Sequence, residues 1–165
     1  MPEEQILSVQ EQNMRDIAGF RMFDDTFMSA VFDKQLLETE LLLRIVLGRE
    51  DLIVTSSKAQ YHLSNIYGHE VRLDVLATDN TGKAYNVEVQ RLVAGASIRR
   101  ARFYAAMVDV TLLDRGQPYE ELPERYTILI AEEDKYNKGM PAYHIENRIL
   151  ELDYAPAGDG GISFM

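Results

Sequence analysis

The sequence predicts an α/β domain, because stretches with helical periodicity alternate with stretches that have the character of strands. The clearest signals are a Leu-rich helical stretch, two alternating runs joined by a short polar turn, and a later helix followed by an apolar run of strand length. The 165 residues are enough for one domain with a substantial hydrophobic core.

The first part of the chain predicts an arm followed by helix. Residues 1–22 are polar and only weakly periodic, which favours an N-terminal arm. Asp24 and Asp25 suit the start of a helix, where negative charge is favourable. Helical spacing of apolar residues then continues to Gly48, a typical helix end. One long helix and two helices broken near Asp33 both fit this pattern.

The middle of the chain predicts a β-hairpin. Apolar and polar residues alternate over 71–78 and again over 84–90. A three-residue loop at 80–82, with its glycine in the left-handed conformation, joins such runs well. Asp79 then faces Lys83, and every facing pair has residue numbers that sum to 162.

The other segments are assigned from length, periodicity and turn residues. Strand character is expected where β-branched and apolar residues cluster, and a helix where they recur every three or four residues. Residues 23–153 form the predicted domain, while the Gly- and Pro-rich stretch 154–165 indicates a linker or the start of a further C-terminal region. The expected elements are strands at 52–55, 60–67, 125–131 and 143–150, and a helix at 97–113.

Composition and charge exclude several classes of protein. The chain has no cysteine, which excludes disulfides, zinc–thiolate sites and cysteine nucleophiles. Its start is acidic and lacks the features of a signal peptide, and no apolar run has membrane-spanning length, so we expect a cytoplasmic protein. The net charge is −10, yet the stretch 90–107 holds several arginines and no acidic residue. A local basic face on an acidic body is therefore expected.

The hairpin carries the chemistry. Its register places Asp74 opposite Glu88, with Gln90 on the same face two residues further on. Two opposed carboxylates repel each other unless a cation lies between them. Mg²⁺ prefers one or two carboxylates together with water and phosphate oxygens, which indicates phosphodiester hydrolysis. The alternative is a solvated strand face on which Arg72 neutralises both acids.

At these residues the sequence resembles the PD-(D/E)xK nuclease superfamily, and within it the recombination-promoting nuclease and transposase branch, in which glutamine replaces the usual lysine. The resemblance extends over roughly residues 24–150. Each block is short, and their order and spacing make the resemblance specific. The blocks that carry it are 24–28, 45–48, 72–75, 82–90, 99–104 and 114–119.

The resemblance implies a restriction-endonuclease-like core, with a mixed β-sheet flanked by α-helices, and Mg²⁺-dependent cleavage of DNA. Asp74 and Glu88 correspond to metal ligands, and the carbonyl of Val89 to a further ligand. Gln90 takes the place of the lysine that orients the water or stabilises the transition state. An amide can orient water, but it cannot supply positive charge.

The superfamily often has one more acidic residue on its first helix. Glu40 is the candidate for this catalytic carboxylate, with Glu38, Asp24 and Asp25 as alternatives. A solvent-facing position on the helix is an equally good interpretation of Glu40.

A basic cluster follows the hairpin and is the expected nucleic-acid contact. Arg99 and Arg102 are three residues apart and share a helix face. With Arg100 they would bind phosphate or support the charge of the site, and Tyr104 would stack on a base or bind a phosphate. The alternatives are a solvated helix face and a half-buried, packed Tyr104.

The sequence therefore predicts a Mg²⁺-dependent DNA endonuclease that accepts Mn²⁺ as a substitute and acts in recombination or transposition. DNA is the expected partner, and a homodimer would suit two cuts. An inactive module that keeps the nuclease fold is the alternative, favoured by the −10 charge and by Gln90. A hydrolase of another phosphodiester is a third reading.

Overall fold

The computed structural model describes residues 14, 25–64, 70–90 and 97–164. No helix in these ranges is long and apolar enough to cross a membrane. The helices are α2 (Asp25–Phe32), α3 (Leu36–Leu47) and α4 (Ile98–Leu112), with short 3-10 turns η1 (Tyr119–Glu121) and η2 (Leu150–Leu152). The strands are β1 (Val54–Ser64), β2 (Glu70–Asp79), β3 (Ala84–Gln90), β4 (Arg125–Ala131), β5 (Tyr143–Ile149) and β6 (Ala155–Phe164).

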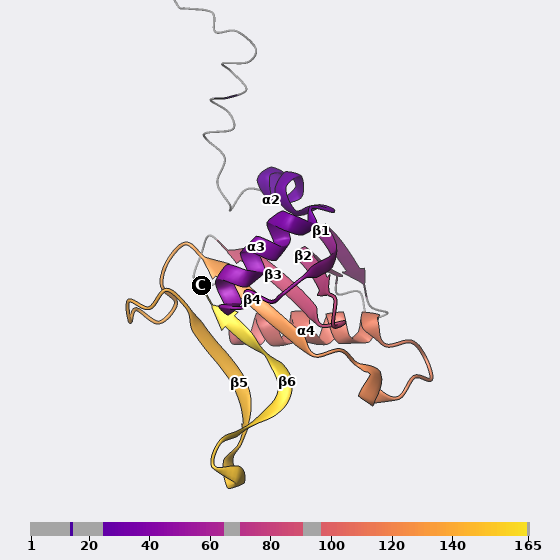
Figure 1. Cartoon of the computed structure of the whole chain (residues 1–165), viewed down its shortest axis with the longest axis vertical. Coiled ribbons are helices and arrows are strands. Elements are labelled where there is room, and N and C mark those ends of the chain that lie inside the picture. Colours follow the sequence, from indigo (N-terminus) through magenta and orange to yellow (C-terminus); the bar gives the residue numbers. More distant parts are fainter. Residues whose placement is uncertain (1–13, 15–24, 65–69, 91–96, 165) are drawn as a thin grey trace, which may run out of the picture.

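All six strands form one mixed sheet with the order β1-β2-β3-β4-β6-β5 (Figure 1). The first three strands form an antiparallel meander. β4 pairs parallel to β3, and α4 lies in the connection between them, as parallel pairing requires a crossover. β6 is parallel to β4, and β5 closes the edge antiparallel to β6. The predicted mixed α/β architecture is confirmed.

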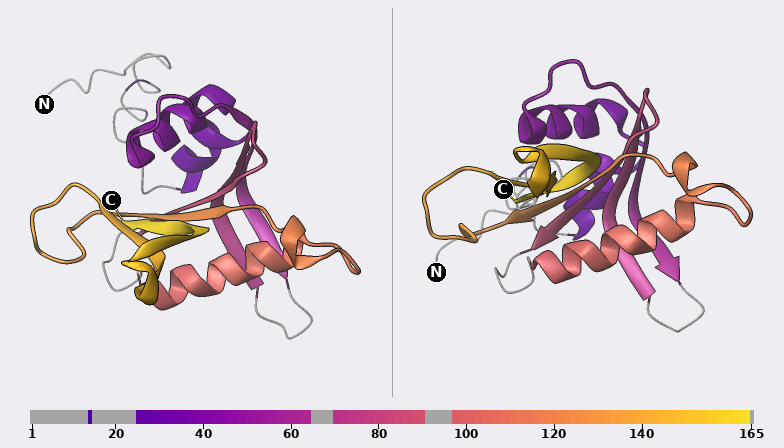
Figure 2. Two further views of the ribbon diagram at one scale, coloured as in Figure 1. Left: turned by 60° about the horizontal axis from the view of Figure 1, so that its bottom comes forward. Right: turned by 90° about the horizontal axis from the view of Figure 1, so that it is seen from below.

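Helices cover both faces of the sheet (Figure 2). α2 and α3 pack on one face, where side chains such as Phe32 and Leu43 meet Val75 and Ile128. α4 packs on the other face, where Ala101 lies against Leu129. β3 is enclosed between these layers and between two neighbouring strands, and its first five residues are buried.

The helical stretch before Gly48 is two helices, which settles the alternative that the sequence left open. Lys34 breaks the stretch with a left-handed φ of +60°, and its N–H donates to the Ser57 carbonyl of β1 at 3.1 Å. The buried Ser57 hydroxyl donates to the Phe32 carbonyl at 2.7 Å. These bonds satisfy the buried polar groups at the end of α2.

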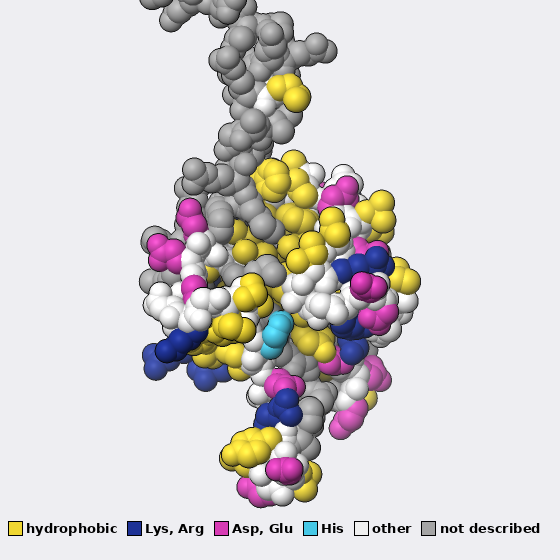
Figure 3. All heavy atoms as spheres, turned by 60° about the vertical axis from the view of Figure 1, so that its left-hand side comes forward, with side chains coloured by type: hydrophobic (Ala, Val, Ile, Leu, Met, Phe, Trp, Pro, Cys, Tyr) yellow, Lys and Arg dark blue, Asp and Glu magenta, His cyan; other side chains and the backbone are white. Residues whose placement is uncertain are grey.

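α3 is apolar around much of its circumference. Leu43 and Val46 are buried, while Leu37, Leu41 and Ile45 remain exposed at a four-residue spacing. Hydrophobic side chains also gather on the molecular face drawn in Figure 3. Because so many of its positions are apolar, periodicity alone could not say which face of this helix meets the sheet.

The predicted hairpin is confirmed. The pairs run from Val75–Val87 to Thr78–Ala84, so their numbers sum to 162 as expected. Gly82 has a φ of +86°, and the Asp79 N–H donates to the Lys83 carbonyl at 3.1 Å. The loop chemistry therefore fixes the register of every residue further along the two strands.

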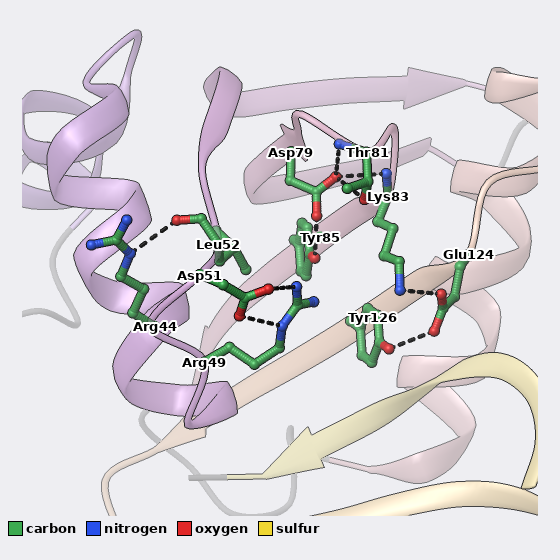
Figure 4. A network of polar contacts seen from close by, with 10 residues as sticks. All are labelled: Arg44, Arg49, Asp51, Leu52, Asp79, Thr81, Lys83, Tyr85, Glu124 and Tyr126. Carbon is green, nitrogen blue, oxygen red and sulfur yellow. Dashed lines mark hydrogen bonds and ion pairs between the residues drawn. The ribbon is translucent and has the colours of Figure 1, made fainter.

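The buried carboxylate of Asp79 organises this loop (Figure 4). One oxygen accepts hydrogen bonds from the N–H groups of Thr81 and Lys83 and from the Thr81 hydroxyl. The other accepts from the buried Tyr85 hydroxyl at 2.7 Å. Burial by itself would raise the pKa of Asp79, but these hydrogen bonds outweigh it and lower the pKa. The loop is thus stabilised around an ionised acid.

Two predictions about the strands were wrong. β1 is one strand over Val54–Ser64 where two pieces at 52–55 and 60–67 were expected, and residues 65–67 lie outside the described residues. The hydroxyl of Ser57 donates to the Phe32 carbonyl, so this polar residue fits inside the strand. Residues 155–164 are also no linker, since they form β6 between β4 and β5. Backbone pairing on both sides holds this Gly-rich strand in the sheet. The predicted arm, apart from Met14, and Asp24 lie outside the described residues.

Candidate functional site

Glu88 is the centre of the candidate site. It lies near the end of β3 and is only 1% exposed. Its partner in the parallel ladder is Leu129, which packs against Ala101 of α4, so Glu88 faces the α4 layer. Val87, its neighbour in the strand, packs on the other side with α2 and α3. Regular alternation in β3 therefore buries a carboxyl group beneath a helix.

Asp74 lies where β2 departs from regular alternation. Leu73 and Val75 are two residues apart and would share a face in a regular strand. Instead, Val75 packs with α2 and α3, whereas Leu73 packs against α4. The register places Gln60 of β1 opposite Asp74, and Gln60 has a left-handed φ of +50°. The predicted register is correct, but β2 changes face at Asp74.

Where the backbone hydrogen bonds between β2 and β3 end, the carboxylate of Asp74 accepts the next hydrogen bond from β3. The last regular pair is Val75–Val87, one step short of Asp74 and Glu88. Beyond it, the Val89 N–H donates to Oδ2 of Asp74 at 2.7 Å. The Asp74 N–H donates to Oε1 of Glu88 at 3.4 Å. These contacts bring the two acids together and place the backbone N–H of Val89 beside Asp74.

Burial and charge act together on Glu88. Burial and, after it, the negative charge of Asp74 raise its pKa to about 9, against the opposing positive charge of Arg100. The metal-free site therefore holds a proton on Glu88 at neutral pH. A cation between the acids would remove their repulsion and displace this proton.

Two polar residues near Glu88 were not singled out from the sequence. Asn86 precedes Glu88 by two residues on the same face, and Thr127 is its partner on β4. Both are fully buried. Their side-chain polar atoms, and Oε2 of Glu88, have no hydrogen-bond partner within the described ranges. A second polar residue, two positions before Glu88 in a strand that alternates with valines, was the signal available in the sequence.

α4 brings the basic cluster to the site in two different ways. Arg99 and Arg102 are exposed, in agreement with a contact surface for phosphate. Arg100 instead turns inward, and its Nη1 donates to Oε1 of Gln90 at 2.8 Å. Its guanidinium lies 4.9 Å from the ring centroid of the half-buried Tyr104. Only one of the three arginines is therefore held against the β3 strand.

The structure places Glu40 away from the carboxylate pair. Oε2 of Glu40 accepts from the Val54 N–H at 3.0 Å, and Oε1 forms an ion pair with Arg44 at 2.7 Å. Val54 pairs with Asp79, five residues from Asp74 along β2, or about 17 Å. Glu40 thus anchors α3 to the start of β1. Of its alternatives, Glu38 is exposed, and the structure does not describe the side chains of Asp24 and Asp25.

A substitution at Glu40 should affect stability alone. Glu40→Ala leaves the Val54 N–H without its acceptor, and we expect a loss of about 1–2 kcal/mol in the free energy of unfolding. The half-exposed ion pair with Arg44 adds little. Urea unfolding measures the loss, and the cleavage rate at a temperature where both proteins are folded should agree within about twofold. A rate that falls with stability unchanged would contradict this structural role.

The donor set suits a hard divalent cation. Asp74 and Glu88 contribute carboxylates, and the buried Oε2 of Glu88 has no hydrogen-bond partner in the described chain. The part of the chain that the structure describes contains no group of three or more His, Cys, Asp or Glu side chains that could hold a metal ion. Two carboxylates with water and phosphate oxygens are a donor set that Mg²⁺ accepts in proteins.

Comparison with known families agrees with the fold. Residues 27–155 match the model of a family described as PD-(D/E)XK nuclease family transposase. Neither the curated proteins nor the solved structures include a match to the chain. The matched range contains the carboxylate pair, Gln90 and α4, and the mixed sheet between helices is the expected restriction-endonuclease-like core. The chain belongs to the PD-(D/E)XK nuclease family of transposases.

Proposed function

We propose that this protein is a Mg²⁺-dependent DNA endonuclease that hydrolyses phosphodiester bonds in recombination or transposition. The observation that carries the proposal is the contact between Asp74 and the buried Glu88 at the point where β2 and β3 separate. A fold has little reason to bury a carboxyl group beside a second carboxylate, because the neighbouring negative charge disfavours its ionisation. A cation would turn this unfavourable arrangement into a binding site.

Asp74, Glu88 and the Val89 carbonyl are the groups that would hold Mg²⁺, with Mn²⁺ as a substitute. When bound, the cation would polarise the phosphodiester and activate a water molecule. The chain's own residues do the rest. The amide of Gln90 would orient that water. Because Gln90 follows Glu88 by two positions in β3, both side chains lie on the same face of the strand.

The α4 surface would bind the DNA. Arg99 and Arg102 are exposed on this helix and would contact phosphates on either side of the cut. Tyr104 offers a ring for stacking beside the site. Because the stretch 90–107 holds no acidic residue, the net charge of −10 is carried elsewhere in the chain. The basic helix can therefore attract DNA to an acidic protein.

A nicking assay on supercoiled plasmid tests the proposal. We expect Mg²⁺ or Mn²⁺ to support nicking and a chelator to stop it. Asp74→Asn keeps an acceptor for the Val89 N–H but weakens the metal ligand, so the rate should fall roughly tenfold to a hundredfold. Asp114→Asn, at an exposed acid beyond α4, serves as the control. Equal nicking by Asp74→Asn and the wild type would remove Asp74 from the site.

The alternative is a module that keeps the fold without cleaving DNA. It is favoured by the proton that Glu88 holds in the metal-free protein and by the neutral Gln90. It predicts no Mg²⁺-dependent rise in melting temperature, whereas the endonuclease predicts a rise that Glu88→Ala abolishes. A panel of RNA, cyclic nucleotides and phosphodiester esters separates DNA cleavage from hydrolysis of another phosphodiester.

We also propose a cytoplasmic location and a homodimer. A chain without cysteine suits a reducing compartment. Two copies would provide two sites for a double-strand cut. Sedimentation velocity with and without a DNA duplex would test the dimer.

A further inference from the structure

Two contacts hold the Arg100 side chain, at a residue whose backbone is fixed in the first turn of α4. The backbone N–H of Arg100 donates to Oγ of Ser97, the residue that caps the helix, at 3.1 Å. The guanidinium donates to Gln90 at 2.8 Å and stacks 4.9 Å from the Tyr104 ring centroid. A planar guanidinium fixed by a hydrogen bond and an aromatic face loses little further freedom when it binds an anion.

One donor of Arg100 has no partner in the described part of the protein. Its Nε is buried and has no hydrogen-bond partner within the described ranges. Guanidinium groups recognise phosphate oxygens through two parallel N–H donors. The hydrogen-bonding partner of Arg100, Gln90, follows Glu88 by two residues in β3, so the guanidinium is anchored beside that acid. Arg100 is thus a cation beside the carboxylates with donor capacity left.

Gln90 lies on the same face of β3 as Glu88, two residues further on, and its amide is neutral. Phosphodiester cleavage accumulates negative charge on the phosphate oxygens, and a fixed cation stabilises it strongly. The hydrogen bond between Gln90 and Arg100 joins this neutral position to the nearest anchored guanidinium. Arg99 and Arg102, by contrast, are exposed on the same helix.

We infer that Arg100 supplies the positive charge that faces the scissile phosphate, and that Gln90 holds Arg100 in place. The inference deepens the proposed nuclease function and rests on it. It gives Gln90 a second task beside orienting water: its carbonyl oxygen fixes the arginine. The positive charge of the site would thus come from Arg100 on α4, because Gln90 on β3 is neutral.

Relocation of the charge tests this inference. Arg100→Gln should lower the maximal single-turnover rate of plasmid nicking by about a hundredfold to a thousandfold, as for loss of one transition-state donor. Gln90→Lys in that background restores a cation beside Glu88, and should recover at least about tenfold of the rate. Arg115→Gln, which removes an exposed charge beyond α4, is the matched control.

A merely structural Arg100 predicts a different result. The melting temperature of Arg100→Gln would then fall, and Gln90→Lys would restore neither the melting temperature nor the rate. That outcome, or a rate of Arg100→Gln within about threefold of the wild type, would overturn the inference.

A measurement without cleavage separates the inference from the nuclease proposal. With Ca²⁺ in place of Mg²⁺, the affinity for a 20-base-pair duplex should fall about tenfold in Arg100→Gln and recover in the double variant. If the wild type cuts no DNA but this affinity pattern appears, the nuclease proposal fails and Arg100 keeps its role toward phosphate. If neither rate nor affinity depends on Arg100, the inference is wrong.

Discussion

Glu88→Gln is expected to abolish Mg²⁺-dependent cleavage and, at the same time, to make the metal-free protein more stable at pH 8. Loss of a metal ligand removes several kcal/mol of charge stabilisation, so the nicking rate should fall about a thousandfold. Glutamine keeps the size and the hydrogen-bonding oxygen of the buried side chain but carries no charge. Single-turnover nicking and urea unfolding in a chelator measure the two effects.

The stability effect follows from the proton on Glu88. Its pKa is 4.5 without the fold's influence and is raised to about 9 by burial, with Asp74 adding and Arg100 opposing. Between these values the folded protein binds a proton that the unfolded chain has released. The stabilising contribution is therefore complete below about pH 4.5 and is lost as the pH rises toward 9, by at most about 1.4 kcal/mol per pH unit.

Glu88→Gln should show no such slope, whereas Glu133→Gln, at an exposed acid, should follow the wild type. Adding Mg²⁺ should flatten the slope of the wild type, because the cation takes the place of the proton. A wild-type protein whose stability is independent of pH from 5 to 9 would contradict the burial of a protonated Glu88.

Asp79→Ala is expected to cause the second large effect, a loss of about 3 kcal/mol in the free energy of unfolding. The substitution leaves two backbone N–H groups and the buried Tyr85 hydroxyl without their acceptor. It also removes the contacts that hold the β2–β3 loop in its register. Chemical unfolding measures the loss, and metal affinity should weaken with it, because Asp74 and Glu88 depend on the same register.

Two controls separate the contributions at this loop. Tyr85→Phe removes one hydrogen bond and should cost about 1 kcal/mol. Asp79→Asn keeps one acceptor but no charge, and its deficit against the wild type should shrink as the pH falls. The sign follows from the lowered pKa of Asp79, whose stabilising effect is present above the unfolded pKa and lost as pH falls through the folded one. An Asp79→Ala protein as stable as the wild type would contradict this account.

The hairpin could be predicted because its determinants are local. A loop of three residues with Gly82 at its left-handed position sets the register of the hairpin. The alternation of apolar and polar residues along β2 and β3 preserves that register. The meeting of Asp74 with Glu88 follows from that count. Arg99, Arg100 and Arg102 could likewise be placed on one helix from their spacing.

Other features depend on contacts between distant segments. The change of face at Asp74 needs Gln60 on another strand, and nothing in the local pattern of either strand announces it. The sequence could not distinguish a structural role of Glu40 from a catalytic one, because its partner, the Val54 N–H, lies on another element. β6 has the composition of a linker, and only pairing with two neighbouring strands makes it part of the sheet.

The crossing at Asp74 has a consequence for how accurately the site is built. One ribbon, made of β1 and β2, contributes apolar side chains to both hydrophobic layers, and Asp74 stands where the ribbon passes from one layer to the other. Shifting the ribbon by a single residue would expose Val75 on one side and Leu73 on the other. Packing in both hydrophobic layers therefore fixes the position of Asp74. A mutation in either layer can displace this acid without contacting it.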